Sequence, residues 1–189
     1  MRATRLAVVL LCSCATDPIT HGIPNLRPVR AGYYRSGQPA NTGEAWGYLR
    51  SIGITDVIKL NANGEGGGCD TEAARHGIVV HRLAIQPTSV VWQAVASFGL
   101  TEILRPDAEV MAKIEAFIRQ NAPGGKRVVL IHCTHGWDRT GLVSGMVLTI
   151  NGDMGKEAAW RYMLDTRFHR AHLGLWREWR AFDPSKGVK

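Results

Sequence analysis

Residues 128–141, V-V-L-I-H-C-T-H-G-W-D-R-T-G, constrain the fold more than any other stretch of the chain. The first four are apolar and predict a short buried strand. Beyond Arg139, apolar residues recur at helical spacing, at Leu142, Val143, Met146, Val147 and Ile150. The stretch therefore predicts a strand, a tight loop and a helix, with Cys133 opening the loop and Arg139 at the helix entrance.

Such a junction between a strand, a loop and a helix can bind an anion. The loop can turn its backbone N–H groups inward, and the new helix adds the positive end of its dipole. The same field favours a thiolate at Cys133, which is a good nucleophile. Arg139 can grip two phosphate oxygens, and the Thr140 hydroxyl can hydrogen-bond the sulfur as it leaves. A cysteine at a strand end is often only a small core residue, but that interpretation does not account for the spacing to Arg139 or for Gly136 inside the loop.

The loop H-C-T-H-G-W-D-R-T-G resembles the signature loop of the cysteine-dependent phosphatases, H-C-x5-R-[ST]-G. A second, independent match is Y-R-S-G-Q-P at residues 34–39, which resembles a bacterial branch of the dual-specificity-like phosphatases. With the C-terminal helices, the resemblance spans residues 33–182. It implies hydrolysis of phosphomonoesters through a phosphocysteine intermediate.

Alternating strand and helix patterns predict an α/β fold with a central sheet of four to five mostly parallel strands and helices on both faces. The expected strands begin near residues 33, 56, 78 and 128, and the expected helices cover residues 42–53, 70–76, 107–120, 140–151, 156–165 and 173–182. The nucleophile loop then lies at the carboxyl end of its strand, where such folds bind ligands. With 189 residues, of which 45% are hydrophobic, the chain suits a single core.

The N-terminal residues indicate a targeting signal. Arg2 and Arg5 precede a short apolar run at residues 6–11, and L-C-S-C resembles a bacterial lipobox that would lipidate Cys14. We therefore expect a lipoprotein-type signal peptide at 1–13, a tether or irregular arm at 14–28 and the phosphatase domain at 29–189. This predicts export to the periplasmic face of a bacterial membrane, with membrane contact through the lipid anchor. The alternative is a cytoplasmic chain with a chance apolar start.

The net charge of +7 indicates which kinds of partner the protein can bind. Lysines and arginines are scattered rather than gathered in a stripe, so we expect no nucleic acid partner. The charge suits a phosphorylated small molecule, a lipid headgroup or a phosphoprotein. No metal or other cofactor is expected, because Arg139 and the loop N–H groups supply the positive charge. The sequence leaves the oligomeric state open.

Substrate contacts are expected from the loop itself, at Thr134, His135, Gly136, Trp137, Asp138 and Arg139. The run C-x-x-G-W-D-R-T resembles the loop of myotubularin-type lipid phosphatases, and the His135 and Asp138 pairing resembles lipid- and inositol-phosphate-directed enzymes. This resemblance ranks a phosphoinositide or inositol phosphate ahead of a phosphotyrosine or phosphoserine protein. The bacterial branch alone would imply a dual-specificity protein phosphatase.

Three residues are candidates for the general acid, and the sequence does not decide between them. In related enzymes it is an aspartate on the long connection before the helix that precedes the catalytic strand. Glu102 lies nearest that position, Asp107 has the usual residue type but resembles a helix cap, and Asp138 lies within the loop. We expect the connection at 86–106 to cover the site. Cys69, after a glycine-rich loop, is a possible redox partner of Cys133.

Two alternatives belong to other functional classes. A pseudophosphatase would use the loop only to bind phosphate, but the intact Cys133, Arg139 and Thr140 argue against it. A rhodanese-like sulfurtransferase also places a cysteine loop after a strand. The H-C-x5-R-T-G spacing with a helix behind it favours a phosphatase.

Overall fold

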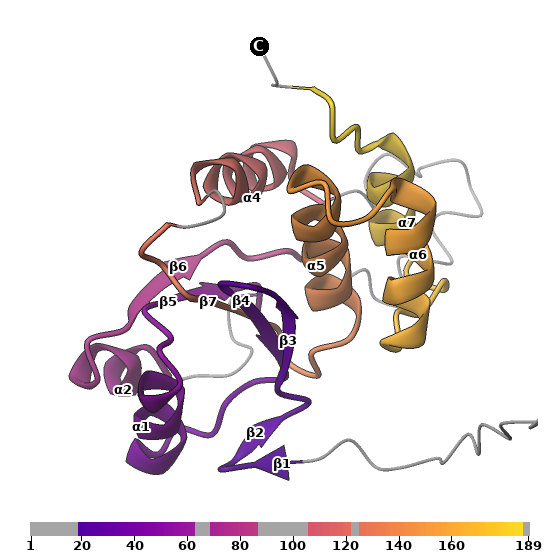
Figure 1. Ribbon diagram of the computed structural model, residues 1–189. Coiled ribbons are helices and arrows are strands. Elements are labelled where there is room, and N and C mark those ends of the chain that lie inside the picture. The colour runs from indigo at the N-terminus through magenta and orange to yellow at the C-terminus, as the bar shows by residue number, and fades with distance from the viewer. Residues whose placement is uncertain (1–18, 63–68, 87–105, 122–124, 187–189) are drawn as a thin grey trace, which may run out of the picture.

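A five-stranded sheet forms the centre of the computed structural model, which describes residues 19–62, 69–86, 106–121 and 125–186 (Figure 1). The strand order is β3–β4–β7–β5–β6. The strands are β3 (Arg27–Arg30), β4 (Tyr33–Ser36), β5 (Asp56–Lys59), β6 (Val79–Arg82) and β7 (Val129–His132). β3 is antiparallel to β4, and the other neighbouring pairs are parallel. The predicted four- to five-stranded, mostly parallel sheet is confirmed.

The central strand β7 carries the nucleophile loop. It lies between β4 and β5, and both Ser36 and Lys59 pair with His132 at its last residue. All four residues of β7 are buried, as expected for a parallel strand covered on both faces. The chain segments that follow β4 and β5 therefore flank Cys133 on its two sides.

Helices cover both faces of the sheet (Figure 1). Helices α1 (Gly43–Ser51) and α2 (Cys69–Arg75) pack on one face, against a core that includes Val57 and Leu130. Helices α4 (Ala108–Gln120) and α5 (Asp138–Ile150) pack on the other face, against Ile58 and Ile131. Helices α6 (Lys156–Asp165) and α7 (Leu173–Ala181) pack beyond α5. The alternating directions of Val57 and Ile58, and of Leu130 and Ile131, follow the two-residue period of a strand.

Helix α5 runs through the interior. Residues 139–149 are all buried, because the sheet lies on one side of the helix and α6 and α7 lie on another. A helix that is largely apolar around its circumference is expected in such a position. The core thus fixes the direction in which the first turn of α5, with Arg139 and Thr140, faces the nucleophile.

The N-terminal segment differs from the expected irregular arm. β1 (Ile19–Thr20) and β2 (Ile23–Pro24) form a two-stranded antiparallel sheet, and β3 then joins the main sheet as its edge strand. Ile23 is fully buried in the core beneath α1. Short edge strands tolerate proline, which donates no ladder hydrogen bond. Residues 19–28 therefore belong to the fold, and the domain begins before residue 29.

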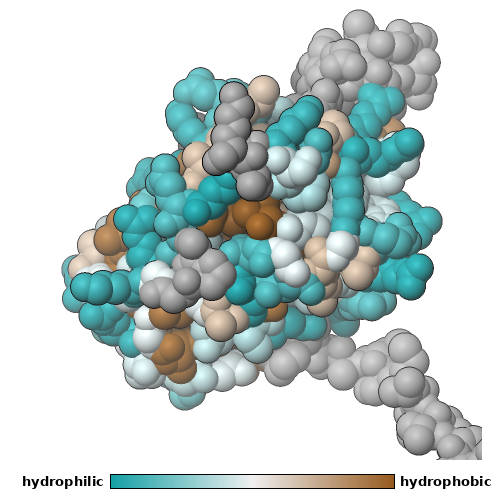
Figure 2. Space-filling view, turned by 45° about the horizontal axis from the view of Figure 1, so that its top comes forward, coloured by the Kyte–Doolittle hydropathy of each residue, from teal (hydrophilic) through white to brown (hydrophobic). Residues whose placement is uncertain are grey.

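Several predictions fall outside the described residues. They are the signal peptide with Cys14 (within 1–18), the long connection with Glu102 (within 87–105) and the side chain of Cys69. No helix within the described ranges is long and apolar enough to cross a membrane. On the face drawn in Figure 2, hydrophilic residues predominate and hydrophobic residues form separate spots.

Candidate active site

The loop between β7 and α5 is wrapped around the sulfur of Cys133. Cys133 is 3% exposed, and the Gly136 N–H donates to its Sγ at 3.3 Å. Gly136 adopts a left-handed φ of 77°, and a Cβ there would lie 2.5 Å from backbone atoms of Ser36 and Gly37. Only glycine fits this position, because it has no Cβ and tolerates positive φ.

Two buried side chains hold the outer side of the loop. Arg35, in β4, donates through Nη2 to the Gly136 carbonyl and through Nη1 to Thr166 Oγ1, each at 2.6 Å. Asn25 donates through Nδ2 to the His135 carbonyl at 2.8 Å. Because the C=O and N–H groups joined by one peptide bond point in opposite directions, carbonyls drawn outward leave N–H groups facing inward. Arg35 and Asn25 thereby shape the anion cradle.

Sequence reasoning missed both residues. Arg35 is 1% exposed, whereas an arginine in a short strand is ordinarily read as solvent-facing. Burial lowers the pKa of Arg35, and negative charge on Cys133 is among the influences that raise it again. A negative charge on Cys133 therefore favours the charged form of the buried Arg35 guanidinium.

Arg139 lies in the first turn of α5 and is 8% exposed. Its Nη1 donates to the carbonyls of Leu60 and Ile85 at 3.4 and 3.3 Å, and its Nη2 to Thr134 Oγ1 at 3.3 Å. These three contacts are long for hydrogen bonds, and they orient the guanidinium at the ends of the strands. It can exchange these contacts for the shorter, charge-assisted ones that a phosphate offers.

Thr140 is fully buried behind the loop. Within the described part of the chain its hydroxyl has no hydrogen-bond partner. A buried hydroxyl without a partner costs free energy, and such groups in native proteins are often found where a ligand or intermediate completes the site. This fits the predicted role of Thr140 beside the departing sulfur.

His132 lies at the end of β7, directly before the nucleophile. It is fully buried, and burial is the main reason that its pKa falls to about 3. The imidazole is therefore neutral at physiological pH. This fits an orienting residue behind the nucleophile better than a proton carrier, as expected from the alternation of side chains along a strand.

Asp138 begins α5 and contacts two histidines from the segment between α6 and α7. The His169 N–H donates to Oδ1 at 2.6 Å, His169 Nδ1 lies 3.0 Å from Oδ1, and His172 Nε2 lies 3.3 Å from Oδ2. Burial raises the pKa of Asp138, but the hydrogen bonds from His172 and His169 outweigh it, and the pKa is lowered. The hydrogen bond with Asp138 in turn raises the pKa of His172. An aspartate held in its charged form is poorly suited to donate a proton.

The other two candidate acids are placed differently. Asp107 is the N-cap of α4, and its carboxylate accepts the N–H groups of Glu109 and Val110. It therefore has the capping role that its sequence position indicated. Glu102 lies outside the described residues, as does the Cys69 side chain, so neither the acid role of Glu102 nor a Cys69–Cys133 pair is tested.

A pocket of about 270 Å³ opens over the nucleophile. Its lining residues are Cys133, Thr134, His135, Asp138, Arg139, His172 and Leu175. Five of these lie in the predicted loop. His172 and Leu175 come from the segment before α7 and from α7 itself, and only tertiary packing brings them to the site.

Two of the predicted contact residues, Gly136 and Trp137, are not among those that line the pocket. The Gly136 N–H contacts the sulfur directly. Trp137 stacks on His135 with ring centroids 5.3 Å apart, and the Arg167 guanidinium lies 5.3 Å from the centroid of its ring. Trp137 thus supports the pocket wall from behind.

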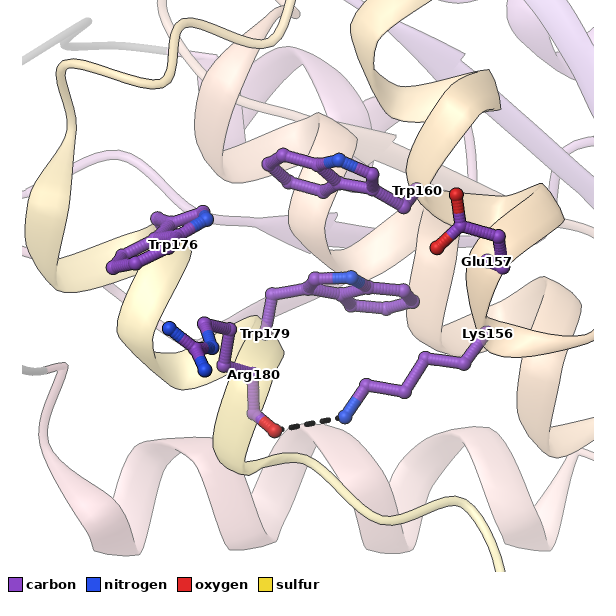
Figure 3. Close-up of a pocket in the computed structure, with 6 residues that line it drawn as sticks. All are labelled: Lys156, Glu157, Trp160, Trp176, Trp179 and Arg180. Atoms are coloured by element: carbon purple, nitrogen blue, oxygen red, sulfur yellow. Dashed lines mark hydrogen bonds between the residues drawn. The ribbon is translucent and has the colours of Figure 1, made fainter.

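A larger pocket of about 510 Å³ lies between α6 and α7 (Figure 3). Trp160, Trp176 and Trp179 form it together with Lys156, Glu157 and Arg180. None of these side chains is a cysteine, serine or histidine that could act as a nucleophile. The smaller pocket, which holds both Cys133 and Arg139, is the one that can carry phosphate chemistry.

Comparison with known proteins identifies the family. The model of a family described as the tyrosine phosphatase family matches residues 21–180. The chain belongs to the tyrosine phosphatase family. It is accordingly a phosphatase, and the predicted cysteine-dependent phosphatase assignment is confirmed. The match also begins before residue 29, in agreement with the folded N-terminal strands. No curated protein matches the chain.

Solved structures agree on the fold. TpbA of P. aeruginosa has a TM-score of 0.60 at 19% identity, covering 89% of this chain and 90% of its own. Tk-PTP in its active form has a TM-score of 0.61 at 19% identity, covering 82% and 96%. The core catalytic domain of the PP-IP phosphatase Siw14 from S. cerevisiae has a TM-score of 0.62 at 14% identity, covering 86% and 87%. At these identities the likeness establishes the cysteine-phosphatase fold.

Proposed function

We propose that this phosphatase hydrolyses phosphomonoesters through a phosphocysteine intermediate on Cys133. The observation that carries the proposal is the hydrogen bond from the Gly136 N–H to Cys133 Sγ, in a pocket that Arg139 also lines. A donor aimed at the sulfur favours the thiolate, and the thiolate is the nucleophilic form.

The reaction has two steps. The Cys133 thiolate attacks phosphorus in line with the ester oxygen, which leaves with a proton from the general acid. The loop N–H groups and Arg139 hold the three equatorial oxygens while charge redistributes. Water then attacks the phosphocysteine, phosphate leaves, and the thiolate is restored with the Thr140 hydroxyl donating to it.

For the general acid we propose Glu102. Asp138 is held ionised by its histidines, and Asp107 caps α4. The proposal for Glu102 rests on its position in the sequence, on the connection that supplies the acid in related enzymes.

The substrate class we propose is a phosphoinositide or inositol phosphate, with a phosphotyrosine protein second. Arg139 brings a positive charge to the pocket wall, and the imidazoles of His135 and His172 line it as well. Such a wall attracts a substrate that carries more than one phosphate. Siw14 is a PP-IP phosphatase, which supports the first class, and a TpbA variant solved with pTyr supports the second.

The test compares wild type with Cys133→Ser on an aryl phosphate, followed by a panel of phosphoinositides, inositol phosphates and phosphopeptides. We expect wild type to turn over and Cys133→Ser to lose turnover to the detection limit while still binding tungstate. Turnover retained by purified Cys133→Ser would contradict the mechanism. A thiosulfate–cyanide assay is run alongside, and the absence of thiocyanate formation excludes a sulfurtransferase. Tungstate binding without any turnover by wild type would indicate a pseudophosphatase.

A further inference from the structure

Asp138, His169 and His172 form a cluster at the wall of the catalytic pocket, which we call the Asp138 cluster. Asp138 begins α5, and both histidines lie in the segment between α6 and α7. We propose that the Asp138 cluster binds a divalent transition-metal ion such as Zn²⁺, and that the bound ion inhibits hydrolysis. The binding is independent of the proposed function, whereas the inhibition rests on it.

The donor atoms have the spacing that such an ion needs. One ligand atom from each residue lies within 4.8 Å of the other two. The two imidazole-to-carboxylate separations are 3.0 Å for His169 and 3.3 Å for His172. Tetrahedral Zn²⁺ with bonds of about 2.0–2.1 Å keeps its ligand atoms about 3.3 Å apart. The two imidazole-to-carboxylate separations are therefore close to this spacing, and the two imidazole nitrogens lie within 4.8 Å of each other.

The donor set also selects the kind of ion. Two imidazole nitrogens with one carboxylate oxygen suit Zn²⁺ and similar transition metals, whereas Mg²⁺ and Ca²⁺ prefer oxygen ligands. Both histidines direct a ring nitrogen at the same carboxylate. An ion in the middle would take the place of the protons that the imidazoles share with Asp138. Two ion pairs to one carboxylate would give the same contacts, and the titration below distinguishes them from a metal site.

The carboxylate is already oriented for binding. The backbone N–H of His169 donates to Asp138 Oδ1 at 2.6 Å, and this hydrogen bond does not involve the His169 side chain. Metal-binding carboxylates are commonly held by such additional hydrogen bonds. Little rearrangement is then needed when an ion arrives from solvent past His169, whose side chain is half-exposed.

The position of the cluster explains the inhibition. Asp138 and His172 line the pocket beside Cys133 and Arg139, whereas His169 does not. Three protein ligands leave one tetrahedral position open, which water or a phosphate oxygen can occupy. An ion there narrows the pocket and retains the phosphate product next to Arg139, so turnover slows.

The binding test titrates Zn²⁺ into full-length Cys133→Ser by calorimetry, so that the catalytic thiolate cannot serve as a ligand. We expect His169→Ala in that background to bind Zn²⁺ at least about tenfold more weakly, consistent with the loss of one of three ligands. The remaining cysteines are the same in every variant, so the difference between variants reports the cluster. Equal affinity with and without His169 would overturn the proposal.

The matched control is His21→Ala. His21 Nδ1 lies 3.0 Å from Glu44 Oε1, which reproduces one imidazole–carboxylate contact, and this pair is not part of a three-ligand group among the described residues. Removing the His21 imidazole should leave the Zn²⁺ affinity of the protein unchanged. His169→Asn, which keeps a polar side chain, guards against a folding defect in the alanine variant and should show the same weakening.

The activity test uses Cys133-containing protein on an aryl phosphate. Zn²⁺ should inhibit wild type, excess EDTA should restore it, and His169→Ala should need at least about tenfold more Zn²⁺ for the same inhibition. The rate of each protein in EDTA serves as its own reference, so a change in basal hydrolysis does not affect the comparison. Binding without inhibition would overturn the inhibitory role. If wild type shows no hydrolysis at all, the proposed function fails, and calorimetry still decides the metal site.

Discussion

At the scale of single residues, Arg35 shows how a phosphate loop is shaped from behind. Its guanidinium spans the Gly136 carbonyl and Thr166, which lie on two different segments. A planar fork can reach both partners at once, whereas a lysine ammonium on its flexible stem cannot reproduce that geometry. Charge alone is therefore not what the position requires.

We expect Arg35→Lys to lower kcat strongly and to reduce the free energy of unfolding by about 1–3 kcal/mol, because a buried carbonyl loses its donor. Urea unfolding and aryl phosphate kinetics measure the two effects. The control is Arg161→Ala on α6, whose side chain is 75% exposed and pairs with an exposed Glu157. An exposed pair of this kind should change stability by less than about 1 kcal/mol. Wild-type kinetics in Arg35→Lys would contradict the role in shaping the loop.

The general acid can be assigned by leaving-group dependence. Removing the acid should harm hydrolysis of alkyl phosphates more than aryl phosphates, because the poorer leaving group needs the proton more. We expect Glu102→Gln to show this difference most clearly, with Asp138→Asn next. Asp107→Asn should affect both substrates alike, since asparagine still caps a helix. Equal losses on both substrates for Glu102→Gln would remove it from the acid role.

At the scale of elements, the junction from β7 to α5 depends on the close approach of another chain segment. Gly136 lies against the turn after β4, and the closeness of Ser36 and Gly37 leaves no room for a side chain. The turn after β4 and the nucleophile loop therefore form one closely packed unit.

Gly136→Ala tests this unit. We expect it to lower turnover by displacing the Gly136 N–H from the sulfur, and to reduce stability by more than about 1 kcal/mol through the clash and the positive φ. Gly152→Ala is the matched control: its φ is 74°, but nothing lies within 4 Å of the added Cβ. It should show a backbone cost of about 1 kcal/mol with unchanged kinetics. If both variants keep wild-type kinetics, the clash at Gly136 does not govern the loop.

Most elements could be predicted from the sequence, because their apolar residues recur with a clear period. α6 has the expected bounds, and α4 and α7 differ from them by one residue. β1 and β2 were missed because strands of two residues have no period to detect and the segment is rich in proline. The loop residues of the site were predicted from a local motif.

The supports of the site could not be predicted in this way. Arg35 and Asn25 reach the loop across long sequence separations, and no pattern along the chain links them to it. His172 enters the pocket only through the packing of α7 on α5. Contacts of this kind depend on the tertiary structure, whereas propensity and spacing are local.

At the scale of the whole molecule, one buried histidine should shape acid stability. His132 is neutral in the fold with a pKa of about 3, against an ordinary value of 6.5. Between these values the unfolded chain binds a proton that the folded chain does not, so stability falls as pH drops below 6.5 and is unaffected by this group above it.

We expect His132→Gln to lose less stability than wild type on acidification. From about pH 7.5 to about pH 5 the wild type should lose about 2 kcal/mol more, at about 1.4 kcal/mol per pH unit below the unfolded value. Urea midpoints measured across this range check it. Because only the pH dependence is compared, a constant packing cost of the substitution does not matter. Parallel stability curves for the two proteins would show that His132 has the same pKa in the folded and unfolded chain.

The hydrogen bonds of Arg35 and Asn25 also set an order of events during synthesis. Asn25 leaves the ribosome 110 residues before the carbonyl that it holds, and Arg35 leaves it 131 residues before Thr166. The nascent chain therefore displays its cysteine before Thr166 is available to hold the outer end of the Arg35 guanidinium. Only when residue 166 has emerged can Arg35 complete its contacts by donating to Thr166 Oγ1. A ribosome stalled between those points would carry a phosphatase that has its nucleophile but lacks a finished site.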